Sequence, residues 1–360
     1  MSSFDQQIMQ RCLELAKQAA GQTAPNPMVG AVVVQAGQIV GEGFHPAAGQ
    51  PHAEVFALRD AAAQARGATV YVNLEPCSHY GRTPPCADAL IQAGVARVVV
   101  GMVDPNPQVA GAGIARLRAA GIEVSLGIEA AACRKLNEGF IHRMLYQKPL
   151  GILKYAMTLD GKIAASSGHS AWVTSPEARG WVHRLRAECD AVIVGGNTVR
   201  RDNPLLTSHG QGHNPLRVVM SRRLDLPTQA QLWQSDAPTL VLSEAEADPA
   251  VRQSLEQQDV EVVSLPVLTP ALAMQQLYER GCLSALWECG GTLAASAIAD
   301  GSVQKILAFV APKIIGGLAA SPVGELGLTK MTEALTLEQL RWEPVGADLL
   351  IEAYLPQLIP

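Results

Sequence analysis

Apolar runs of strand length alternate with helical patterns along the first 130 residues, and this alternation restricts the possible folds most. An amphipathic pattern at 5–20 comes first, followed by two short strands around a turn at Gly37. A helical pattern then precedes a strand-like run three times. The helical patterns are at 53–65, 86–94 and 112–120, and the strand-like runs that follow them are at 69–74, 96–102 and 122–128. Strands and helices that alternate in this way form a mostly parallel sheet covered on both faces. The chain is therefore expected to be an α/β protein that begins with a three-layer α/β/α domain.

A second alternating region follows the segment RMLYQKP (143–149), whose proline makes it the candidate linker after a helical pattern at 129–140. Strand-like runs occur at 151–157, 190–195, 216–220, 238–242, 260–264, 283–287 and 304–310. Helical patterns at 176–188 and 270–280 lie between some of them, and weak alternation at 335–355 favours a terminal hairpin. We expect two domains, 1–146 and 147–360, each long enough to bury a core.

Composition excludes several classes of protein. A net charge of −5 argues against a surface built to neutralise nucleic-acid phosphates. No apolar run reaches the roughly 18 residues that a bilayer requires, and the amino terminus does not resemble a signal peptide. Seven cysteines, an odd number, are typical of reduced thiols rather than of a disulfide framework. We expect a cytoplasmic enzyme that binds neither nucleic acid nor a membrane.

One histidine and two cysteines form a pattern that suits a metal ion. His52 opens an alanine-rich helix, Cys77 follows a strand, and Cys86 begins the next helix. One imidazole and two thiolates are a natural ligand set for Zn²⁺ and leave a fourth tetrahedral position for water. Glu54 stands two positions from His52 and projects in a different direction, so it can move protons rather than bind the ion. The pattern predicts a catalytic zinc site with Glu54 as the proton shuttle.

A purely structural zinc site is the alternative, although it would normally close with a fourth ligand, which motif spacing does not supply. Zinc deaminases share the histidine-x-glutamate and proline-cysteine pairs, but their two cysteines usually stand two residues apart. Here the eight residues SHYGRTPP separate the cysteines. The remaining cysteines, at 12, 133, 189 and 282, are expected to be small buried hydrophobes.

This long loop, together with PNPMVG (25–30), GEGFHPAAGQPHAE (41–54) and DPNPQVAG (104–111), resembles the deaminase half of a known family. The family is the bifunctional deaminase-reductase of riboflavin biosynthesis. The resemblance implies a cytidine-deaminase-like fold in which Asn26 holds the pyrimidine. It also implies a ribose-phosphate side formed by His45, His79, Arg82 and Asn106, although Arg82 alone would be read as a solvated loop charge.

The second half lacks the G-x-G-x-x-G fingerprint of dinucleotide-binding folds. Glycine pairs follow two predicted strands, at 195–196 and 290–291, and the second pair precedes a helical pattern. Backbone N–H groups at such a turn can cradle a phosphate, but glycine pairs also mark ordinary turns. From the residues alone, both interpretations remain open.

Resemblance extends to the reductase half of the same family, which is related in fold to dihydrofolate reductase and uses NADPH. It rests on LKYAMTLDGKIA (153–164), SGHSAWVTSPEAR (167–179), LRAECDAVIVGGNTVRRDNPLLT (185–207), ECGGTL (288–293) and APKIIGG (311–317). It implies that NADPH contacts Lys154, Ala156, Trp172, Thr198, Asp202, Gly290, Gly291, Thr292, Leu293, Ala294, Ala295 and Ser296. It implies that the sugar-phosphate substrate contacts Ser170, Arg186, Leu206 and Glu288. Trp172 would equally suit core packing, and Asp160 would equally suit a turn at Gly161.

Two positions depart from the family pattern. Ser208 and His209 stand where an arginine usually follows the LT of PLLT, so an expected phosphate contact is missing. Cys289 replaces a common glycine. Neither change removes a group that hydride transfer needs, because the reaction requires a cofactor and a positioned substrate rather than a protein nucleophile.

The resemblance implies an enzyme of two consecutive steps on small pyrimidine ribose-phosphate substrates, with Zn²⁺ and NADPH as cofactors. The first step hydrolytically deaminates 2,5-diamino-6-(5-phosphoribosylamino)pyrimidin-4(3H)-one, and the second reduces the ribosyl group to a ribityl chain. The resemblance also implies a homo-oligomer, either dimer or tetramer. One alternative is a cytidine or tRNA adenosine deaminase fused to an unrelated domain, which the eight-residue insert and the acidic charge disfavour. Another is that the second half is a non-catalytic binding or dimerising module.

Overall fold

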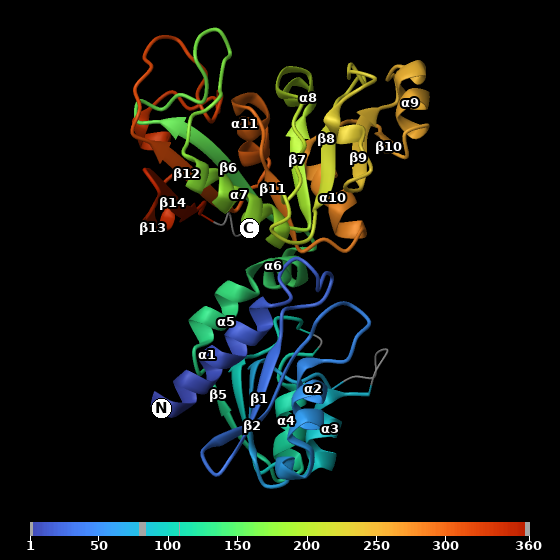
Figure 1. Cartoon of the computed structure of the whole chain (residues 1–360), viewed down its shortest axis with the longest axis vertical. Helices are drawn as coiled ribbons and strands as arrows, with labels where there is room; N and C mark the ends of the chain where they lie inside the picture. Colours follow the sequence, from blue (N-terminus) through green and yellow to red (C-terminus); the bar gives the residue numbers. More distant parts are fainter. Residues whose placement is uncertain (1–2, 79–83, 108, 357–360) are drawn as a thin grey trace. The chain divides into compact units, whose positions relative to one another are not determined.

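The chain forms two compact units, Met1–Gln147 and Lys148–Pro360, each of which is described by itself (Figure 1). The structure is a computed structural model that describes residues 3–78, 84–107 and 109–356. Each unit has its own sheet and its own apolar core. In these ranges no helix is both long and apolar enough to cross a membrane.

The first unit contains a five-stranded sheet in the order β2-β1-β3-β4-β5. Its strands are β1 (Gly30–Gln35), β2 (Gln38–Phe44), β3 (Thr69–Leu74), β4 (Arg97–Met102) and β5 (Glu123–Leu126). β3, β4 and β5 are parallel, as helical crossovers require. β1 pairs antiparallel with β2 and β3, so the sheet is less parallel than predicted. The cause is the tight turn at Ala36 and Gly37, which can join only antiparallel strands.

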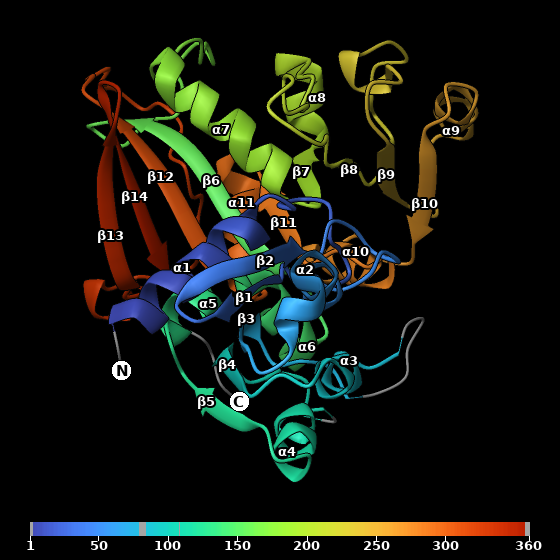
Figure 2. The same ribbon diagram turned by 60° about the horizontal axis from the view of Figure 1, so that its bottom comes forward.

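Helices cover both faces of this sheet, which confirms the predicted three layers (Figure 2). One face carries α1 (Ser3–Lys17) and α5 (Ala130–Leu136), and the other carries α2 (Ala53–Ala61), α3 (Cys86–Ala93) and α4 (Ala112–Ala119). Alternate residues of the central strands, such as Val70 and Val72 on β3, join Ala57 and Leu90 in the core beneath α2 and α3. The strand residues that alternate toward this face and the apolar stripes of the helices thus pack into one core.

The segment from 129 onward differs from the prediction. Two helices replace the single one, because the chain turns at Asn137 between α5 and α6 (Glu138–Tyr146). Asn137 accepts a hydrogen bond from Met28 N at 2.8 Å and so holds the segment that precedes β1. Helix α6 includes residues 143–146, which were predicted to be linker; the helix ends three residues before Pro149.

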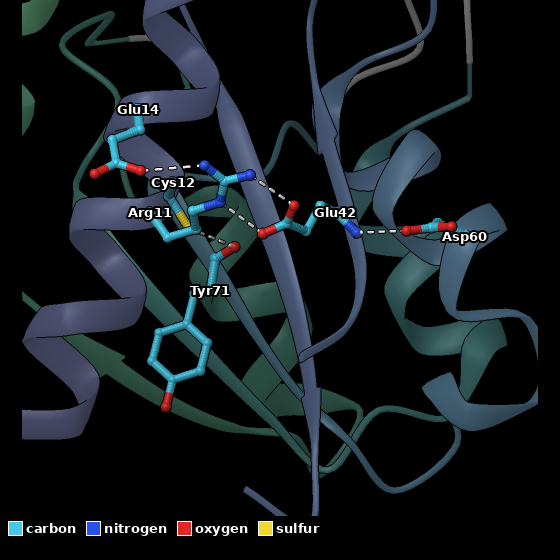
Figure 3. Close-up of polar contacts among 6 residues, drawn as sticks. All are labelled: Arg11, Cys12, Glu14, Glu42, Asp60 and Tyr71. Atoms are coloured by element: carbon cyan, nitrogen blue, oxygen red, sulfur yellow. Dashed lines mark hydrogen bonds and ion pairs between the residues drawn. The ribbon is translucent and has the colours of Figure 1, made fainter. Parts of the chain in front are cut away.

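Polar contacts attach helices of both layers to β2 (Figure 3). Arg11 on α1 donates two hydrogen bonds to the Glu42 carboxylate, at 2.7 and 2.9 Å. The backbone N–H of Glu42 donates to Asp60 on α2 at 3.0 Å. Cys12 on α1 donates its thiol hydrogen to the Tyr71 carbonyl of β3 at 3.5 Å. The edge strand is therefore held by both helices beside it.

The second unit contains a nine-stranded sheet in the order β10-β9-β8-β7-β11-β6-β12-β14-β13. Neighbouring strands are parallel from β10 to β12, and the terminal strands β13 and β14 form the predicted antiparallel hairpin. The strands are β6 (Leu150–Thr158), β7 (Ala191–Gly195), β8 (Leu216–Met220), β9 (Thr239–Glu244), β10 (Glu261–Leu265), β11 (Ser284–Trp287), β12 (Lys305–Ala311), β13 (Glu338–Val345) and β14 (Asp348–Tyr354).

Two cores flank this sheet, one on each face. Residues of α7 (Pro176–Glu188), α8 (Gly196–Asp202) and α9 (Pro249–Glu256) enter one core, and residues of α10 (Pro270–Glu279) and α11 (Gly291–Ala299) enter the other. The sequence patterns predicted α7, α10 and the start of α11 but missed α8 and α9. The missed α9 had a readable signal, because Asp248 caps it and Pro249 occupies its first turn.

Candidate functional site

The start of α2 is held at the sheet by close backbone packing. A Cβ added to Gly41 would lie 2.4 Å from Ala57 O, and one added to Gly43 would lie 2.6 Å from Ala53 O. The alanines on this face of α2 are fully buried. Glycines on the strand and alanines on the helix therefore let the two backbones touch, which fixes the position of His52 at the helix N-cap.

Three potential metal ligands meet in this unit. His52 Nδ1 lies 3.2 Å from Cys86 Sγ and 3.6 Å from Cys77 Sγ. The ligand atoms of all three residues lie within 4.8 Å of one another, and the described ranges contain no other such cluster of histidine, cysteine and acidic residues. One nitrogen and two sulfurs suit Zn²⁺. Among the residues that the structure describes, no fourth ligand joins these three. The donor set therefore fits a zinc ion with one open position.

Hydrogen bonds at the cluster favour a thiolate on Cys77, whereas hydrogen bonding with Cys77, and then burial, raises the pKa of the Cys86 thiol. Hydrogen bonding with Cys86, and then with His52, lowers the pKa of the Cys77 thiol to about 4. Cys86 is the first residue of α3, and its backbone N–H donates a hydrogen bond to Cys77 Sγ at 3.3 Å. A thiolate in this position is ready to bind a metal near neutral pH.

Glu54 is buried beside the cluster. Burial raises the pKa of its carboxyl to about 7, and its side chain is 3% exposed. A carboxyl group that titrates near neutral pH can both accept and release a proton at that pH. Glu54 therefore has the chemistry of a proton shuttle.

A cavity of about 550 Å³ opens in front of these residues. Glu54, Asn26, His45 and Asn106 line it together with His52 and Cys77. His45 Nδ1 lies 3.0 Å from the Pro51 carbonyl, and its Nε2 lies 3.0 Å from Asn26 Nδ2. Burial lowers the pKa of His45, and a neutral ring that donates from Nδ1 and accepts at Nε2 satisfies both contacts. The structure thus brings three of the five predicted substrate residues together, whereas His79 and Arg82 lie outside the described residues.

Sequence reasoning missed the residues that hold the Asn26 segment. Asn73 on β3 accepts a hydrogen bond from Gly30 N at 2.8 Å and donates to Met28 O at 3.0 Å. Asn137 adds the bond to Met28 N and a second bond to Met28 O. An asparagine in the otherwise apolar strand TVYVNL was the available signal, because a buried amide needs partners.

Glu75 is a second residue that was missed. It follows β3 and precedes Pro76 and Cys77, and it is buried. Its carboxylate accepts hydrogen bonds of 2.9 to 3.2 Å from the backbone N–H groups of Asp104, Gly111, Gly113 and Ile114. Glu75 therefore joins the strand end that bears Cys77 to the loop that bears Asn106.

In the second unit, a buried ionic cluster forms where β6, α7 and the end of β11 meet. The side chain of Glu288 is 8% exposed, and its carboxylate accepts hydrogen bonds from Arg186 at 2.6 and 3.1 Å and from Lys154 at 3.0 Å. Burial alone would raise the pKa of Glu288, but the charges of Arg186 and Lys154 hold it well below its usual value. Lys154, expected at the cofactor, thus binds Glu288, which is expected at the substrate.

The predicted cofactor segment surrounds the start of α11. Gly290 is its N-cap and Gly291 its first residue. Gly291 and Thr292 line a cavity of about 580 Å³ with residues of the 320–328 segment. Gly195, which precedes α8 with its Thr198 and Asp202, lies close to α11, since a Cβ there would meet Leu293 at 3.4 Å. The residue before α8 therefore lies beside the Leu293 side chain of α11.

The remaining predicted residues lie on β6, on the chain between β6 and α7, or after α8, where Leu206 is 3% exposed. Ala156 is half-buried on β6, and Ser170 is exposed. Trp172 is 68% exposed and lies under the Arg179 guanidinium at 4.4 Å, so the core-packing alternative is wrong. Asp160 binds the backbone N–H groups of Ile315 and Gly316 and so supports the APKIIGG segment.

Both halves of the sequence match known families. Residues 2–102 match the family described as the cytidine and deoxycytidylate deaminase zinc-binding region. Residues 149–351 match the RibD C-terminal domain family. The two matches fall in the order in which the two sites occur.

Individual proteins resemble the whole chain. A riboflavin biosynthesis protein RibD from Synechocystis is 63% identical over 98% of this chain and 96% of its own length. The RibD of Escherichia coli is 40% identical over 96% of this chain and 98% of its own. A solved structure of Acinetobacter baumannii RibD is 40% identical, with a TM-score of 0.90 over 98% of this chain and 99% of that chain.

Proposed function

We infer the roles of individual side chains from one premise: the chain belongs to the RibD family of riboflavin biosynthesis proteins. It is accordingly a bifunctional enzyme with a zinc-dependent deaminase and an NADPH-dependent reductase. The deaminase hydrolyses 2,5-diamino-6-(5-phosphoribosylamino)pyrimidin-4(3H)-one, and the reductase acts on 5-amino-6-(5-phosphoribosylamino)uracil. An unrelated second domain is not favoured. We assign the deaminase to the first unit and the reductase to the second.

The deaminase assignment depends on one observation: His52, Cys77 and Cys86 cluster beside buried Glu54. His52, Cys77 and Glu54 line the cavity in front of the cluster. These three residues would hold Zn²⁺. When bound, zinc supplies Lewis acidity that brings the pKa of a water toward about 7. Glu54 would accept a proton from the attacking water and return it to the leaving amine, which its pKa near neutrality permits.

Substrate binding in this cavity follows from the lining side chains. Asn26 is an amide with both a donor and an acceptor, which suits the edge of a pyrimidine. Its bond to His45 fixes which way it faces. Asn106 lies on the loop held by Glu75 and lines the cavity, and by family resemblance it would face the ribose-phosphate part of the substrate. For His79 and Arg82 the same role remains a proposal from the sequence pattern.

In the reductase, we propose substrate contacts at the ionic cluster around Glu288 and cofactor contacts at the starts of α8 and α11. Arg186, Leu206, Glu288 and Ser170 would contact the sugar-phosphate substrate. The cofactor would contact Ala156, Trp172, Thr198, Asp202 and the residues from Gly290 to Ser296, with Lys154 between the two ligands. NADPH supplies the hydride when bound. The helix starts at Gly196 and Gly291 offer backbone N–H groups to its phosphates.

Both activities can be tested separately on the purified chain. Ammonia release from the diaminopyrimidine phosphate tests the deaminase, and NADPH oxidation with the deaminated compound tests the reductase. Both should occur in a zinc-loaded sample. Failure of either reaction alone would reject the assignment for that unit only.

Small pyrimidine ribose phosphates are the partners that both activities require. We further propose a homo-oligomer, dimer or tetramer, on the family resemblance alone, to be tested by light scattering. We also propose a cytoplasmic location, which the odd number of cysteines supports because they suit a reducing compartment.

A further inference from the structure

Helix α6 forms one wall of the cavity in front of the metal cluster. Its residues Phe140, Arg143 and Met144 all line this cavity of about 550 Å³. Residues three and four positions apart lie on one face of a helix, so the three side chains form a continuous surface. Asn137, the N-cap of α6, binds both Met28 N and Met28 O. The helix that carries Arg143 is therefore tied to the segment before β1.

Arg143 brings a positive charge to this wall. Its side chain is half-buried, and its Nε atom is buried, so the guanidinium begins inside the wall rather than at the exposed surface. A guanidinium keeps its charge near neutral pH, and its planar fork of N–H groups matches the oxygens of a phosphate. A cation that is partly withdrawn from water also attracts an anion more strongly than an exposed one does.

The other charges around the cavity make this cation important for an anionic ligand. Glu54, Glu75 and Asp104 line the cavity too, and Arg143 is the only arginine or lysine among the lining residues that the structure describes. His45 is mainly neutral at pH 7, because burial lowers its pKa. A Zn²⁺ ion held by two thiolates and a neutral imidazole would add no net charge. A phosphate in the described part of the cavity would therefore depend on Arg143 for its counter-charge.

Backbone groups already bind the two carboxylates at the loop that bears Asn106. The carboxylate of Glu75 accepts hydrogen bonds from four N–H groups, and Asp104 Oδ1 accepts one from Asn106 N at 2.8 Å. These N–H groups partly offset the negative charge of both carboxylates. The repulsion that they exert on an anion in the cavity is correspondingly reduced.

We propose that Arg143 binds the 5-phosphate of the deaminase substrate and makes the cavity select the phosphorylated compound over the same compound without its phosphate. This inference rests on the assignment of the deaminase to the first unit and adds a specificity-determining residue from α6. The phosphate monoester of the substrate carries between about 1.5 and 2 negative charges near pH 7. Because Arg143 neither holds zinc nor moves protons, it should affect substrate binding rather than chemistry.

The test measures ammonia release by the zinc-loaded full chain with two compounds. One is 2,5-diamino-6-(5-phosphoribosylamino)pyrimidin-4(3H)-one, and the other is its dephosphorylated form. Arg143→Met keeps an unbranched side chain but removes the charge, and Arg143→Lys keeps a cation without the planar fork. Arg134→Met is the matched control, because Arg134 is an exposed arginine of α5 and does not line the cavity. Zinc content and melting temperature are measured for every variant.

The decisive quantity is the phosphate preference, defined as the ratio of kcat/KM for the two compounds. The unmodified chain should prefer the phosphorylated compound. Arg143→Met should reduce this preference about tenfold to hundredfold, as loss of a hydrogen bond to a charged group predicts, through a higher KM for the phosphorylated compound alone. Its kcat should change less than about threefold, since the zinc ligands and Glu54 are untouched. Arg143→Lys should lose part of the preference, and Arg134→Met should lose none.

The contrary results are equally distinct. A merely structural role for Arg143 would lower kcat/KM for both compounds by the same factor, and that result would overturn the inference. An undiminished preference in Arg143→Met would do the same. If Arg143→Met loses zinc or melts early, an undiminished preference in Arg143→Lys is the overturning result. An unmodified chain that releases no ammonia from the phosphorylated compound would instead reject the deaminase assignment itself.

Discussion

Cys86 Sγ lies 3.2 Å from His52 Nδ1, although 34 residues separate them in the sequence. His52 is the N-cap of α2 and Cys86 is the first residue of α3, so the starts of two helices meet at the cluster. The positive ends of both helix dipoles stabilise thiolate ligands there. Glu54, the second residue of α2, is placed to move protons rather than to bind metal.

Substituting Glu54 by glutamine should separate metal binding from catalysis. The three ligands remain, so zinc content should stay near one ion per chain. Ammonia release should fall by roughly 10² to 10⁴-fold, since the proton shuttle is lost. Metal analysis and an ammonia assay measure the two effects, with NADPH oxidation as the internal control. Near-normal deamination in this variant would remove Glu54 from the assigned role.

Removing zinc should affect only one of the two activities. Prolonged treatment with a chelator should abolish ammonia release, because His52, Cys77 and Cys86 alone cannot activate water. NADPH oxidation with the deaminated substrate should persist, since the reductase residues belong to the second unit. Added Zn²⁺ should restore deamination. Parallel loss of both activities would contradict this separation.

The zinc ligands and the α/β architecture were predictable because each has a local signal. His52, Cys77 and Cys86 have distinctive chemistry at strand and helix ends, and most strands carry apolar runs of the right length. Glu75 and Asn137 could not be assigned roles, because their partners are backbone groups 29 to 39 and 109 residues away. The stacking of His183 on α7 against His209 in the loop after α8, with ring centroids 4.0 Å apart, depends equally on tertiary folding. Such contacts leave no periodic pattern in the sequence.

Replacing Glu75 by glutamine should disturb the loop at 104–114. An amide nitrogen would face backbone N–H donors and leave some of them unpaired, at a cost of about 1–3 kcal/mol in the free energy of unfolding. KM of the deaminase should rise while zinc remains bound, because Asn106 lies on this loop and the ligands do not. Chemical denaturation, metal analysis and steady-state kinetics test these points. Glu14→Gln on the exposed side of α1 is the matched control and should match the unmodified chain in all three.

Glu288→Gln should destabilise the second unit in a pH-dependent way. The pKa of Glu288 is depressed by Arg186 and Lys154, so its contribution to stability is present above its unfolded pKa of about 4.3 and is lost as pH falls through the folded pKa. At pH 7 the variant leaves buried cations unpaired, and the loss should be about 3–5 kcal/mol. Below the unfolded pKa the difference from the unmodified chain should shrink. Denaturant unfolding at pH 7 and at successively lower pH measures it, and a constant difference would contradict the ionic explanation.

Gly290 and Gly291 are adjacent at the start of α11 but should respond differently to alanine. A Cβ on Gly291 would lie 2.6 Å from Ser321 O and 3.1 Å from Gly324 N, whereas one on Gly290 would meet no protein atom within 4 Å. Gly291→Ala should therefore push the 320–328 segment away, lower the melting temperature of the cofactor-free protein and raise KM for NADPH. The expected loss of about 1–3 kcal/mol is that of overpacking.

Gly290→Ala is the matched control for that loss of stability. It should melt like the unmodified chain without cofactor, because space exists for its methyl group. If the backbone at this position approaches the cofactor phosphates as proposed, Gly290→Ala will still raise KM for NADPH, which separates ligand contact from folding. Ammonia release should be normal in both variants, because the first unit is untouched. Unchanged melting and unchanged KM in Gly291→Ala would show that the cavity beside α11 does not receive the cofactor.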